Sequence, residues 1–454
     1  MSSDRPRPPS VERLLAVTRT RAGGEYDATA LTKTARATID DERARLVSGE
    51  EPRTIDELAD AVHTRLEDFL DGDIPGAINA TGVIVHTNLG RAPWPDEAIA
   101  AVAGAGSPLL LEIDRETGRR GARFRRAEEH LITLTGAEDA LVTNNNAAAV
   151  ALAVGLAGRG GGVVVSRGEL VEIGGGVRIP EIIRRAGAKL IEVGTTNRTA
   201  AADFAEPLAG GRAKAVLRVH PSNFTMTGFT ATPDQTEVAR IAHDHGAVVI
   251  DDLGSGALLP TERFGLTHEP MPSERLAAGS DVVTFSGDKL VGGPQAGLVV
   301  GRSDLIARMR RDPLARAMRP DKATLLGVAA TLGLYRAGLA VSRIPVWTMI
   351  AMPADELRAR AERIAARIGS AVAVVPLSST VGGGSLPGET IASFGVAVTG
   401  RSANRTLADL RRVGPRPVIG RIEDDRVVLD LRTVDPRLDD ELASTVEAAL
   451  AVGR

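Results

Sequence analysis

The segment DVVTFSGDKLVGGPQAGLVVG, residues 281–301, holds the residues best suited to chemistry. An apolar run ends at Ser286-Gly287-Asp288, Lys289 follows, and glycines precede the next apolar run. A lysine just past a strand end can be partly desolvated, which lowers its pKa and frees its lone pair to form a Schiff base. An isolated lysine would more often be a surface residue in a turn. The flanking Ser286 and glycines, and the scarcity of lysine (five residues against 50 arginines), favour the chemical role for Lys289.

An acidic pair, Asp251 and Asp252, ends the apolar run AVVID at residues 247–251. A carboxylate is what pyridoxal phosphate needs against its ring nitrogen, because the protonated ring is the electron sink that stabilises a carbanion. The alternative is that one of the two aspartates simply caps the following turn. Taken alone, the pair favours neither reading.

The segment TNNNAAAVALA, residues 143–153, passes from a strand end directly into an apolar helical stretch. Free N–H groups at a helix start, together with the side chains of Asn145 and Asn146, can hold the phosphate of a cofactor. Ordinary N-capping by asparagine is the alternative. The phosphate cradle, Asp252 and Lys289 follow each other in the order found in fold-type I pyridoxal-phosphate enzymes, and this order makes the three signals stronger together.

The elements that must position these residues are short β-branched runs separated by Ala-rich helical stretches. Continuous apolar strands alternating with helices indicate an α/β fold with a mostly parallel sheet that is covered on both faces. Ligands then gather at the carboxyl ends of the strands. The expected strands are residues 140–144, 162–166, 189–194, 215–220, 247–251, 281–286 and 297–301.

The two ends of the chain have other patterns, so we expect three domains, at residues 1–75, 76–335 and 336–454. Residues 1–75 have helical spacing, with Ser10 as an N-cap and a capping box at Thr54 and Glu57. The last domain is expected to be a small α+β unit with an amphipathic helix at 353–369 and a hairpin around Glu423-Asp424-Asp425. Between these, residues 374–388 are expected to form a turn-rich segment.

Composition excludes several classes of protein. The chain of 454 residues has no cysteine, which excludes a disulfide framework, a thiolate nucleophile and cysteine-ligated metal sites. The seven histidines show no metal-ligand spacing, so no metal is expected. No apolar run has the 18 or more residues of a membrane span, and no signal-peptide pattern is visible, so we expect a cytoplasmic globular protein.

Five segments carry a resemblance that covers nearly the whole chain. They are INATGVIVHTNLGRAPW (78–94), GAEDALVTNNNAAAVALA (136–153), SRGELVEIGGGVRIPEI (166–182), DDLGSG (251–256) and SGDKLVGGPQAG (286–297). They resemble the bacterial selenocysteine synthases, the L-seryl-tRNA(Sec) selenium transferases. The resemblance implies a fold-type I pyridoxal-phosphate-dependent transferase, similar to aspartate aminotransferase, with a seven-stranded sheet, a small C-terminal domain and an N-terminal helical domain.

The resemblance also implies roles for particular residues. Lys289 is expected to carry pyridoxal 5′-phosphate, and Asp252 to face the pyridine nitrogen. Asn145, Asn146 and Ala147, with Ser286, are expected to form the phosphate cup. Members of the family convert serine esterified to tRNA(Sec) into selenocysteine by β-elimination to an aminoacrylyl-tRNA, followed by addition of selenium from selenophosphate. Lys289 is expected to take the α-proton.

Selenophosphate is a small polyanion, so cationic forks should converge near the cofactor. By similarity to the anion pocket of the family, we expect Arg91, Arg123, Arg316 and Arg319 to bind it, with Asp288 beside the lysine organising them. The alternative is that most arginines in these two clusters form solvated faces or surface ion pairs.

The tRNA partner is implied by the resemblance and not by charge. Residues 1–75 occupy the place of the family's tRNA-binding domain, yet they contain 11 basic and 16 acidic residues. Family members assemble as rings of dimers, so a homo-oligomer, a decamer, is expected. Two alternatives stay open. The chain could be a related pyridoxal-phosphate lyase acting on a small free amino acid or sugar acid, or a non-catalytic tRNA-binding protein that keeps the enzyme fold.

Overall fold

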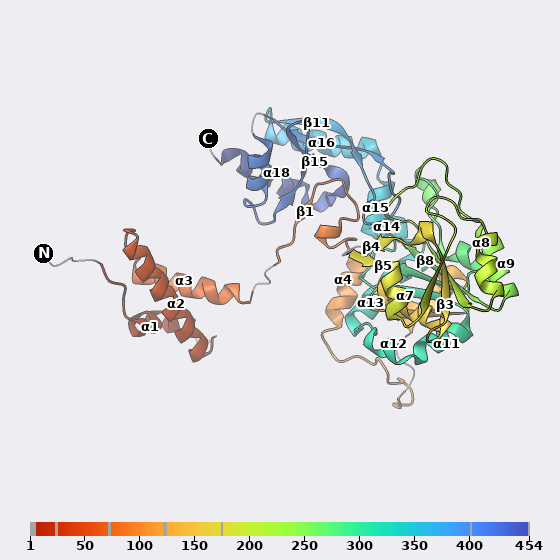
Figure 1. The fold of residues 1–454 in the computed structure, drawn as a ribbon. Helices are drawn as coiled ribbons and strands as arrows, with labels where there is room; N and C mark the ends of the chain where they lie inside the picture. Colours follow the sequence, from red (N-terminus) through yellow and green to blue (C-terminus); the bar gives the residue numbers. More distant parts are fainter. Residues whose placement is uncertain are drawn as a thin grey trace. The chain divides into compact units, whose positions relative to one another are not determined.

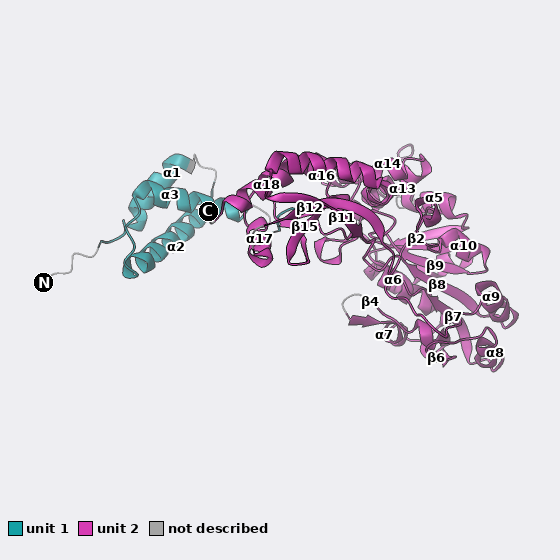
Figure 2. Cartoon of the chain, turned by 90° about the horizontal axis from the view of Figure 1, so that it is seen from above, with its two compact units in different colours: residues 1–76 teal, residues 77–454 magenta. Residues whose placement is uncertain are grey.

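The computed structural model of the protein describes residues 6–22, 26–70, 74–120, 125–173, 176–399 and 402–452. It separates the chain into two compact units, residues 1–76 and 77–454 (Figure 2). Residues 77–454 form one unit by this division, so the domain boundary at residue 335 stays a prediction. No helix within the described ranges is long and apolar enough to cross a membrane.

The first unit consists of three helices, α1 (Val11–Ala22), α2 (Ala28–Val47) and α3 (Ile55–Asp68). Buried apolar residues from all three helices form its core: Leu14, Leu15, Leu31, Ala35, Ile39, Leu58, Ala59, Val62 and Leu66. The capping box is confirmed, since Thr54 accepts a hydrogen bond from the N–H of Glu57 and the Glu57 carboxylate accepts one from the N–H of Thr54. The unit therefore folds around its own apolar stripe.

A seven-stranded sheet forms the centre of the second unit (Figure 1). The strand order is β2-β10-β9-β8-β7-β3-β6, and only β10 runs antiparallel to its neighbours. All seven strands expected from the sequence lie in this sheet. The strands are β2 (Asp139–Thr143), β3 (Gly162–Ser166), β6 (Lys189–Val193), β7 (Ala213–Val219), β8 (Val248–Gly254), β9 (Val282–Ser286) and β10 (Gly297–Gly301).

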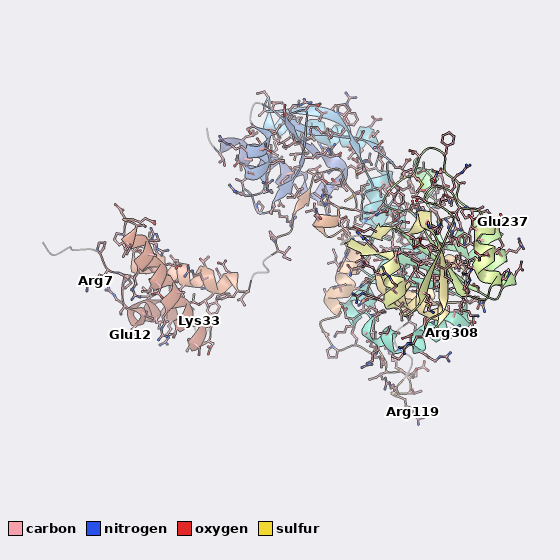
Figure 3. All side chains as sticks on the ribbon, in the orientation of Figure 1. Arg7, Glu12, Lys33, Arg119, Glu237 and Arg308 are labelled. Atoms are coloured by element: carbon pink, nitrogen blue, oxygen red, sulfur yellow. The ribbon has the colours of Figure 1, made fainter. Side chains whose placement is uncertain are left out.

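Helices cover both faces of this sheet, because successive strand residues point to opposite sides. Val163 and Val165 pack in one core with α6, α7 and α11, whereas Val164 packs in another with α8 and α9. The outer sides of these helices are polar, as Glu237 on α9 and Arg308 on α11 show (Figure 3). The helices are α4 (Asp96–Gly104), α5 (Arg126–Thr135), α6 (Asn146–Val154), α7 (Ile179–Arg185), α8 (Ala202–Ala209), α9 (Gln235–Asp244), α10 (Pro272–Ala277), α11 (Ser303–Arg311), α12 (Pro313–Ala317), α13 (Lys322–Arg336), α14 (Ala340–Arg343) and α15 (Pro345–Ala351).

A second, antiparallel sheet of four strands follows, in the order β11-β12-β15-β14. It packs with α16, α17 and α18, and the hairpin at Asp424 and Asp425 is confirmed, both residues having positive φ. The elements are α16 (Ala354–Ile368), β11 (Val372–Ser379), β12 (Ile391–Val398), α17 (Ala403–Leu410), β14 (Arg421–Glu423), β15 (Arg426–Asp430) and α18 (Asp439–Ala451).

Two details differ from the sequence-based expectations. The first part of the expected turn segment is strand β11, which ends at Ser379 and contains Pro376. Proline is tolerated because β11 is an edge strand, where one side of the backbone needs no partner. The second detail is β1 (Ile78–Asn79), expected in the large domain, which pairs with β13 (Val418–Ile419). Distant parts of the chain thus meet in the C-terminal sheet region.

Candidate active site

A cavity of about 380 Å³ lies where the carboxyl ends of β2, β7, β8 and β9 meet. It brings together Lys289 with most of the other predicted site residues. Its lining consists of Thr87, Arg91, Asn145, Asn146, Ala147, Val171, Val177, Val219, His220, Ser222, Asn223, Asp252, Gly254, Ser286, Asp288, Lys289, Gln295, Gly383 and Gly384.

Lys289 is almost completely enclosed, with only 9% of its surface exposed. Burial lowers the pKa of its amine, although the nearby carboxylates of Asp252 and Asp288 act in the opposite direction. Glycines make room for the amine: a Cβ atom on Gly384 would lie 3.2 Å from Lys289 Nζ, and one on Gly254 would lie 3.6 Å away. Both glycines have positive φ, a backbone conformation that residues with a side chain rarely adopt. The backbone therefore encloses an amine that is easily deprotonated.

Asp252 is the acidic partner in the cavity, and it is 4% exposed. Its Oδ1 accepts hydrogen bonds from Asn146 Nδ2 at 2.8 Å and from Thr284 Oγ1 at 3.2 Å. Burial raises the pKa of the Asp252 carboxyl, while the hydrogen bond from Asn146 and the charge of Lys289 lower it. Asp251 lies next to it in β8, but its carboxylate is in contact with Ser280 and Arg275 and does not line the cavity.

The start of α6 lies at the cavity wall beside Ser286. Asn145 is the N-cap of α6, since its Oδ1 accepts a hydrogen bond from Ala148 N–H at 2.9 Å. The capping alternative is therefore confirmed for Asn145, and the Asn146 side chain is used to hold Asp252. Neither the N–H groups of Asn146 and Ala147 nor the Ser286 hydroxyl has a hydrogen-bond partner among the described residues. These three donors, and not the asparagine amides, are what this edge offers an anion.

Arg91 and Asp288 form an ion pair on the other side of the lysine. Arg91 NH1 lies 2.6 Å from Asp288 Oδ2, and Ala92 N–H donates to the carbonyl oxygen of Asp288. Asp288 is 5% exposed, and its second oxygen, Oδ1, has no hydrogen-bond partner within the described part of the chain. The guanidinium group of Arg91 is thus already paired with the carboxylate of Asp288. The Oδ1 atom of that carboxylate is a buried acceptor next to Lys289 in the chain.

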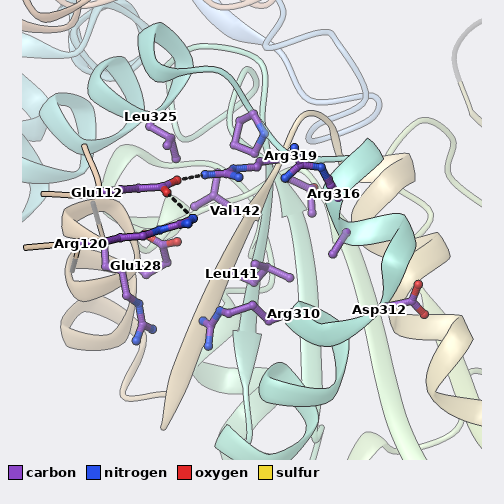
Figure 4. A pocket seen from close by; sticks show the side chains of 14 residues that line it. Glu112, Arg120, Glu128, Leu141, Val142, Arg310, Asp312, Arg316, Arg319 and Leu325 are labelled. Carbon is purple, nitrogen blue, oxygen red and sulfur yellow. Dashed lines mark hydrogen bonds and ion pairs between the residues drawn. The ribbon is translucent and has the colours of Figure 1, made fainter. Parts of the chain in front are cut away.

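The other predicted arginines do not line this cavity. Arg316 and Arg319 line a separate cavity of about 550 Å³, where Arg319 and Arg120 are bound to Glu112 (Figure 4). The end of β2 contributes to both, since Thr143 lines one cavity and Asn145 the other. Arg123 lies outside the described residues.

Several lining residues escaped the site prediction. His220 and Ser222 follow β7, so the rule that ligands gather at strand ends could have found them. Gly383 and Gly384 could not be found in this way, since they belong to the β11–β12 connection of the other sheet. Val171 and Val177, near the short hairpin β4 (Glu172–Ile173) and β5 (Val177–Arg178), are the apolar residues of this region that line the cavity. Within the described ranges, no three acidic or histidine side chains are placed to hold a metal ion.

Replacing Asn146 with alanine tests the position of Asp252. A hydrogen-bond donor stabilises the ionised carboxylate, so its loss raises the pKa of Asp252 further. In a plot of kcat against pH, we expect the fall of kcat on the acidic side to begin at a higher pH. We also expect the maximal kcat to decrease about tenfold, since a hydrogen bond to a charged group contributes about 1.5–3 kcal/mol. The matched control is Asn145→Ala, which removes the cap of α6 and a hydrogen bond to Asn144 Oδ1 but no contact with Asp252. It should lower thermal stability without moving the profile. Identical profiles for both variants would contradict the assignment.

Comparison with known proteins gives matches over most of the chain. A sequence model of the family described as "SelA: L-seryl-tRNA selenium transferase" matches residues 77–435. The L-seryl-tRNA(Sec) selenium transferase of Rhizobium meliloti (strain 1021) is 47% identical over 388 residues, which are 83% of this chain and 83% of the relative. That of Moorella thermoacetica is 41% identical and covers 97% of this chain and 96% of the relative.

Among solved structures, D-glucosaminate-6-phosphate ammonia-lyase is similar to the chain with a TM-score of 0.60 and 22% sequence identity. The match covers 87% of this chain and 99% of the lyase. At this identity, the similarity extends to the fold alone.

Proposed function

This chain belongs to the L-seryl-tRNA selenium transferase family, and we propose that the cavity around Lys289 is the site of its reaction. The enzyme converts L-seryl-tRNA(Sec) to L-selenocysteinyl-tRNA(Sec). The observation that carries the site assignment is the enclosed Lys289 amine, whose pKa is lowered by burial and which faces Asp252 and Asp288.

The donor set of the cavity fits pyridoxal 5′-phosphate. The free N–H groups of Asn146 and Ala147, with the Ser286 hydroxyl, offer neutral donors for the phosphate. Asp252 is a buried acceptor held in place by Asn146 and Thr284, as a protonated ring nitrogen requires. The absence of side chains at Gly254 and Gly384 leaves space beside the lysine amine. When bound there, the cofactor supplies the electron sink for chemistry at the α-carbon of serine.

The side chains of the cavity are proposed to transfer protons during the reaction. In its neutral form, Lys289 Nζ can take the proton from the α-carbon, because the amine is already desolvated. The proton taken by Lys289 Nζ can then pass to the seryl hydroxyl, which leaves as water, while Asp288, held by Arg91, lies at the same cavity wall as the amine. Selenium from selenophosphate then adds at the β-carbon, and the phosphorus–selenium bond is cleaved by water with release of phosphate.

The selenium donor is proposed to be selenophosphate, held by guanidinium groups. The lining of the cavity at Arg316 and Arg319 contains five arginines and three acidic residues, so arginines are in excess. Four of the arginines are ion-paired with Glu112 or Asp139, whereas Arg316 is not paired with any described residue and is the one best placed for a small polyanion. Its segment is tied to the Lys289 site by a hydrogen bond of 2.9 Å from Asn144 N–H to the carbonyl oxygen of Met318. We propose that Arg91, Arg123, Arg316 and Arg319 serve the donor, the more remote ones acting between copies in a homo-oligomer, a ring of dimers.

Replacing Arg316 with alanine tests this anion role. Arg316 has no hydrogen bond or ion pair to another described residue, so its removal breaks no internal contact. We expect KM for selenophosphate to rise about tenfold, because a charged hydrogen bond is lost, while the visible absorbance of the cofactor is unchanged. Arg311→Ala, an exposed arginine of α11, is the matched control. An unchanged KM would remove Arg316 from the donor site.

The first unit is proposed to bind the tRNA. It folds on its own core, and its surface carries both charges, as Arg7, Glu12 and Lys33 show (Figure 3). We expect a variant without residues 1–76 to keep the cofactor absorbance and to lose the shift of seryl-tRNA(Sec) in a gel. The reason is that every residue lining the Lys289 cavity lies beyond residue 76. A retained shift at the same protein concentration would place tRNA binding on residues 77–454.

The proposed function is tested by incubating the holoenzyme with seryl-tRNA(Sec) and selenophosphate and identifying the amino acid released from the tRNA. Selenocysteine is expected, with no turnover of free serine. Turnover of a free amino acid or sugar acid, with none of the charged tRNA, would favour the lyase alternative. We propose that the enzyme acts in the cytoplasm, because its substrate is a charged tRNA.

A further inference from the structure

A second cavity of about 380 Å³ adjoins the Lys289 cavity, and the two share His220. Consecutive residues line the two cavities: Ser222 and Asn223 line the first, and Phe224 and Thr225 line the second. The same holds for the β11–β12 connection, where Gly384 lines the first and Leu386 the second. A group attached to a substrate at Lys289 can therefore extend into this second space.

We propose that this second cavity binds the terminal nucleoside of the aminoacylated tRNA. This inference rests on the proposed function. An ester places the ribose one oxygen atom from the seryl carbonyl, so a serine positioned at Lys289 must have its nucleoside in an adjoining space. The volume lies within the range of small-molecule sites, about 300–1,000 Å³.

The lining has the chemistry of a nucleoside site and differs from that of the arginine-rich cavity. It contains six threonines and one asparagine, which match the neutral donors and acceptors of a ribose and a base edge. The hydroxyl groups of Thr196, Thr230 and Thr232 have no hydrogen-bond partner among the described residues. The carboxylate of Glu169, by contrast, is already bound to Arg218 at 2.9 Å.

An aromatic face and a cation complete the match. Phe224 is 36% exposed on the cavity wall, in a chain with only eight phenylalanines, and an unpaired base can stack on such a ring. Arg198 is exposed at the same cavity, and its guanidinium group has no partner among the described residues. It is therefore free to contact the single phosphate that joins the last nucleoside to the rest of the RNA.

Backbone pairing holds these side chains in a fixed arrangement. The N–H of Thr199 donates to the carbonyl oxygen of Ala231 at 3.0 Å, and the N–H of Ala231 donates to that of Asn197 at 3.0 Å. The opposite wall contains Glu269, 2% exposed, whose Oε1 lies 3.3 Å from His220 Nε2. The loops after β6 and β7 are thus joined by backbone hydrogen bonds into one wall of the cavity.

The test compares two esters that differ only in the nucleoside. The holoenzyme, without a selenium donor, is titrated with 2′(3′)-O-seryladenosine and with serine methyl ester, and Kd is read from the visible absorbance of the cofactor. We expect the wild type to bind seryladenosine at least about fivefold more tightly, because stacking of one base on an aromatic ring is worth about this factor at its lower limit. Phe224→Ala should remove most of this preference and leave the Kd of the methyl ester unchanged. Arg198→Ala should weaken binding only of a seryladenosine that carries a 5′-phosphate, because that phosphate is the group proposed to contact Arg198.

Two controls separate a nucleoside site from a general effect. Phe224→Tyr keeps the aromatic face and should keep the preference, and Arg212→Ala removes an exposed arginine that is paired with Glu206 outside the cavity. Equal binding of the two esters by the wild type, or a preference unaffected by Phe224→Ala, would overturn the proposal. If neither ester changes the absorbance of the wild type, the assignment of the Lys289 site itself fails.

Discussion

Replacing Lys289 with alanine is expected to abolish selenium transfer, with a loss of at least about 10⁴-fold, and to leave the protein folded. The change removes the only lysine amine that lines the cavity among the described residues, so covalent attachment of the cofactor and proton transfer are lost together. Folding should be retained, because an amine buried at 9% exposure with a lowered pKa contributes little to stability. Circular dichroism and thermal unfolding check the fold, and visible absorbance checks the cofactor.

The attachment itself is measured by borohydride reduction of the holoenzyme and mass spectrometry of its peptides. A pyridoxyl group is expected on Lys289 and absent from Lys214, an exposed lysine on β7 that serves as the internal control. A pyridoxyl group on any other lysine would contradict the assignment. Partial recovery of activity in Lys289→Ala by methylamine would show that the lost group is an amine, because the vacated space can admit a small one.

Replacing Asp252 with asparagine is expected to lower kcat by about 10²–10³-fold with the cofactor still attached. The substitution keeps the shape and the acceptor that Asn146 and Thr284 contact, but it removes the charge that a protonated ring nitrogen needs. Steady-state kinetics measure the loss, and the position of the visible absorbance band reports the altered ring.

Asp251→Asn is the matched control, because the two aspartates are adjacent in β8 and both are buried. Asp251 contacts Ser280 and Arg275 instead of lining the cavity, so its replacement should affect stability and leave kcat within about threefold. Equal losses in kcat for both variants would show that the charge of Asp252 has no special role.

The sequence alone was sufficient for the existence and approximate positions of the seven main strands, because each is a separate apolar run. It also predicted that Lys289 and Asp252 meet at one edge of the sheet, since each follows or ends such a run, and both line the same cavity. The family resemblance singled out the remaining residues by motif, among them Arg91 and Asp288, which form an ion pair although 197 positions separate them. Their roles in the reaction stay predictions.

Only the tertiary structure decided which side chains serve each other. The side chain of Asn146 holds Asp252, which leaves only its backbone N–H for the phosphate, because the strand order places the start of α6 near β8. Gly384 reaches Lys289 through a connection of the second sheet, and no local pattern marks it. Arg316 and Arg319 line a separate cavity, and no local pattern in their segment marks this either. Spacing along the chain encodes the elements, whereas contacts between distant elements depend on sheet order and packing, which no short segment contains.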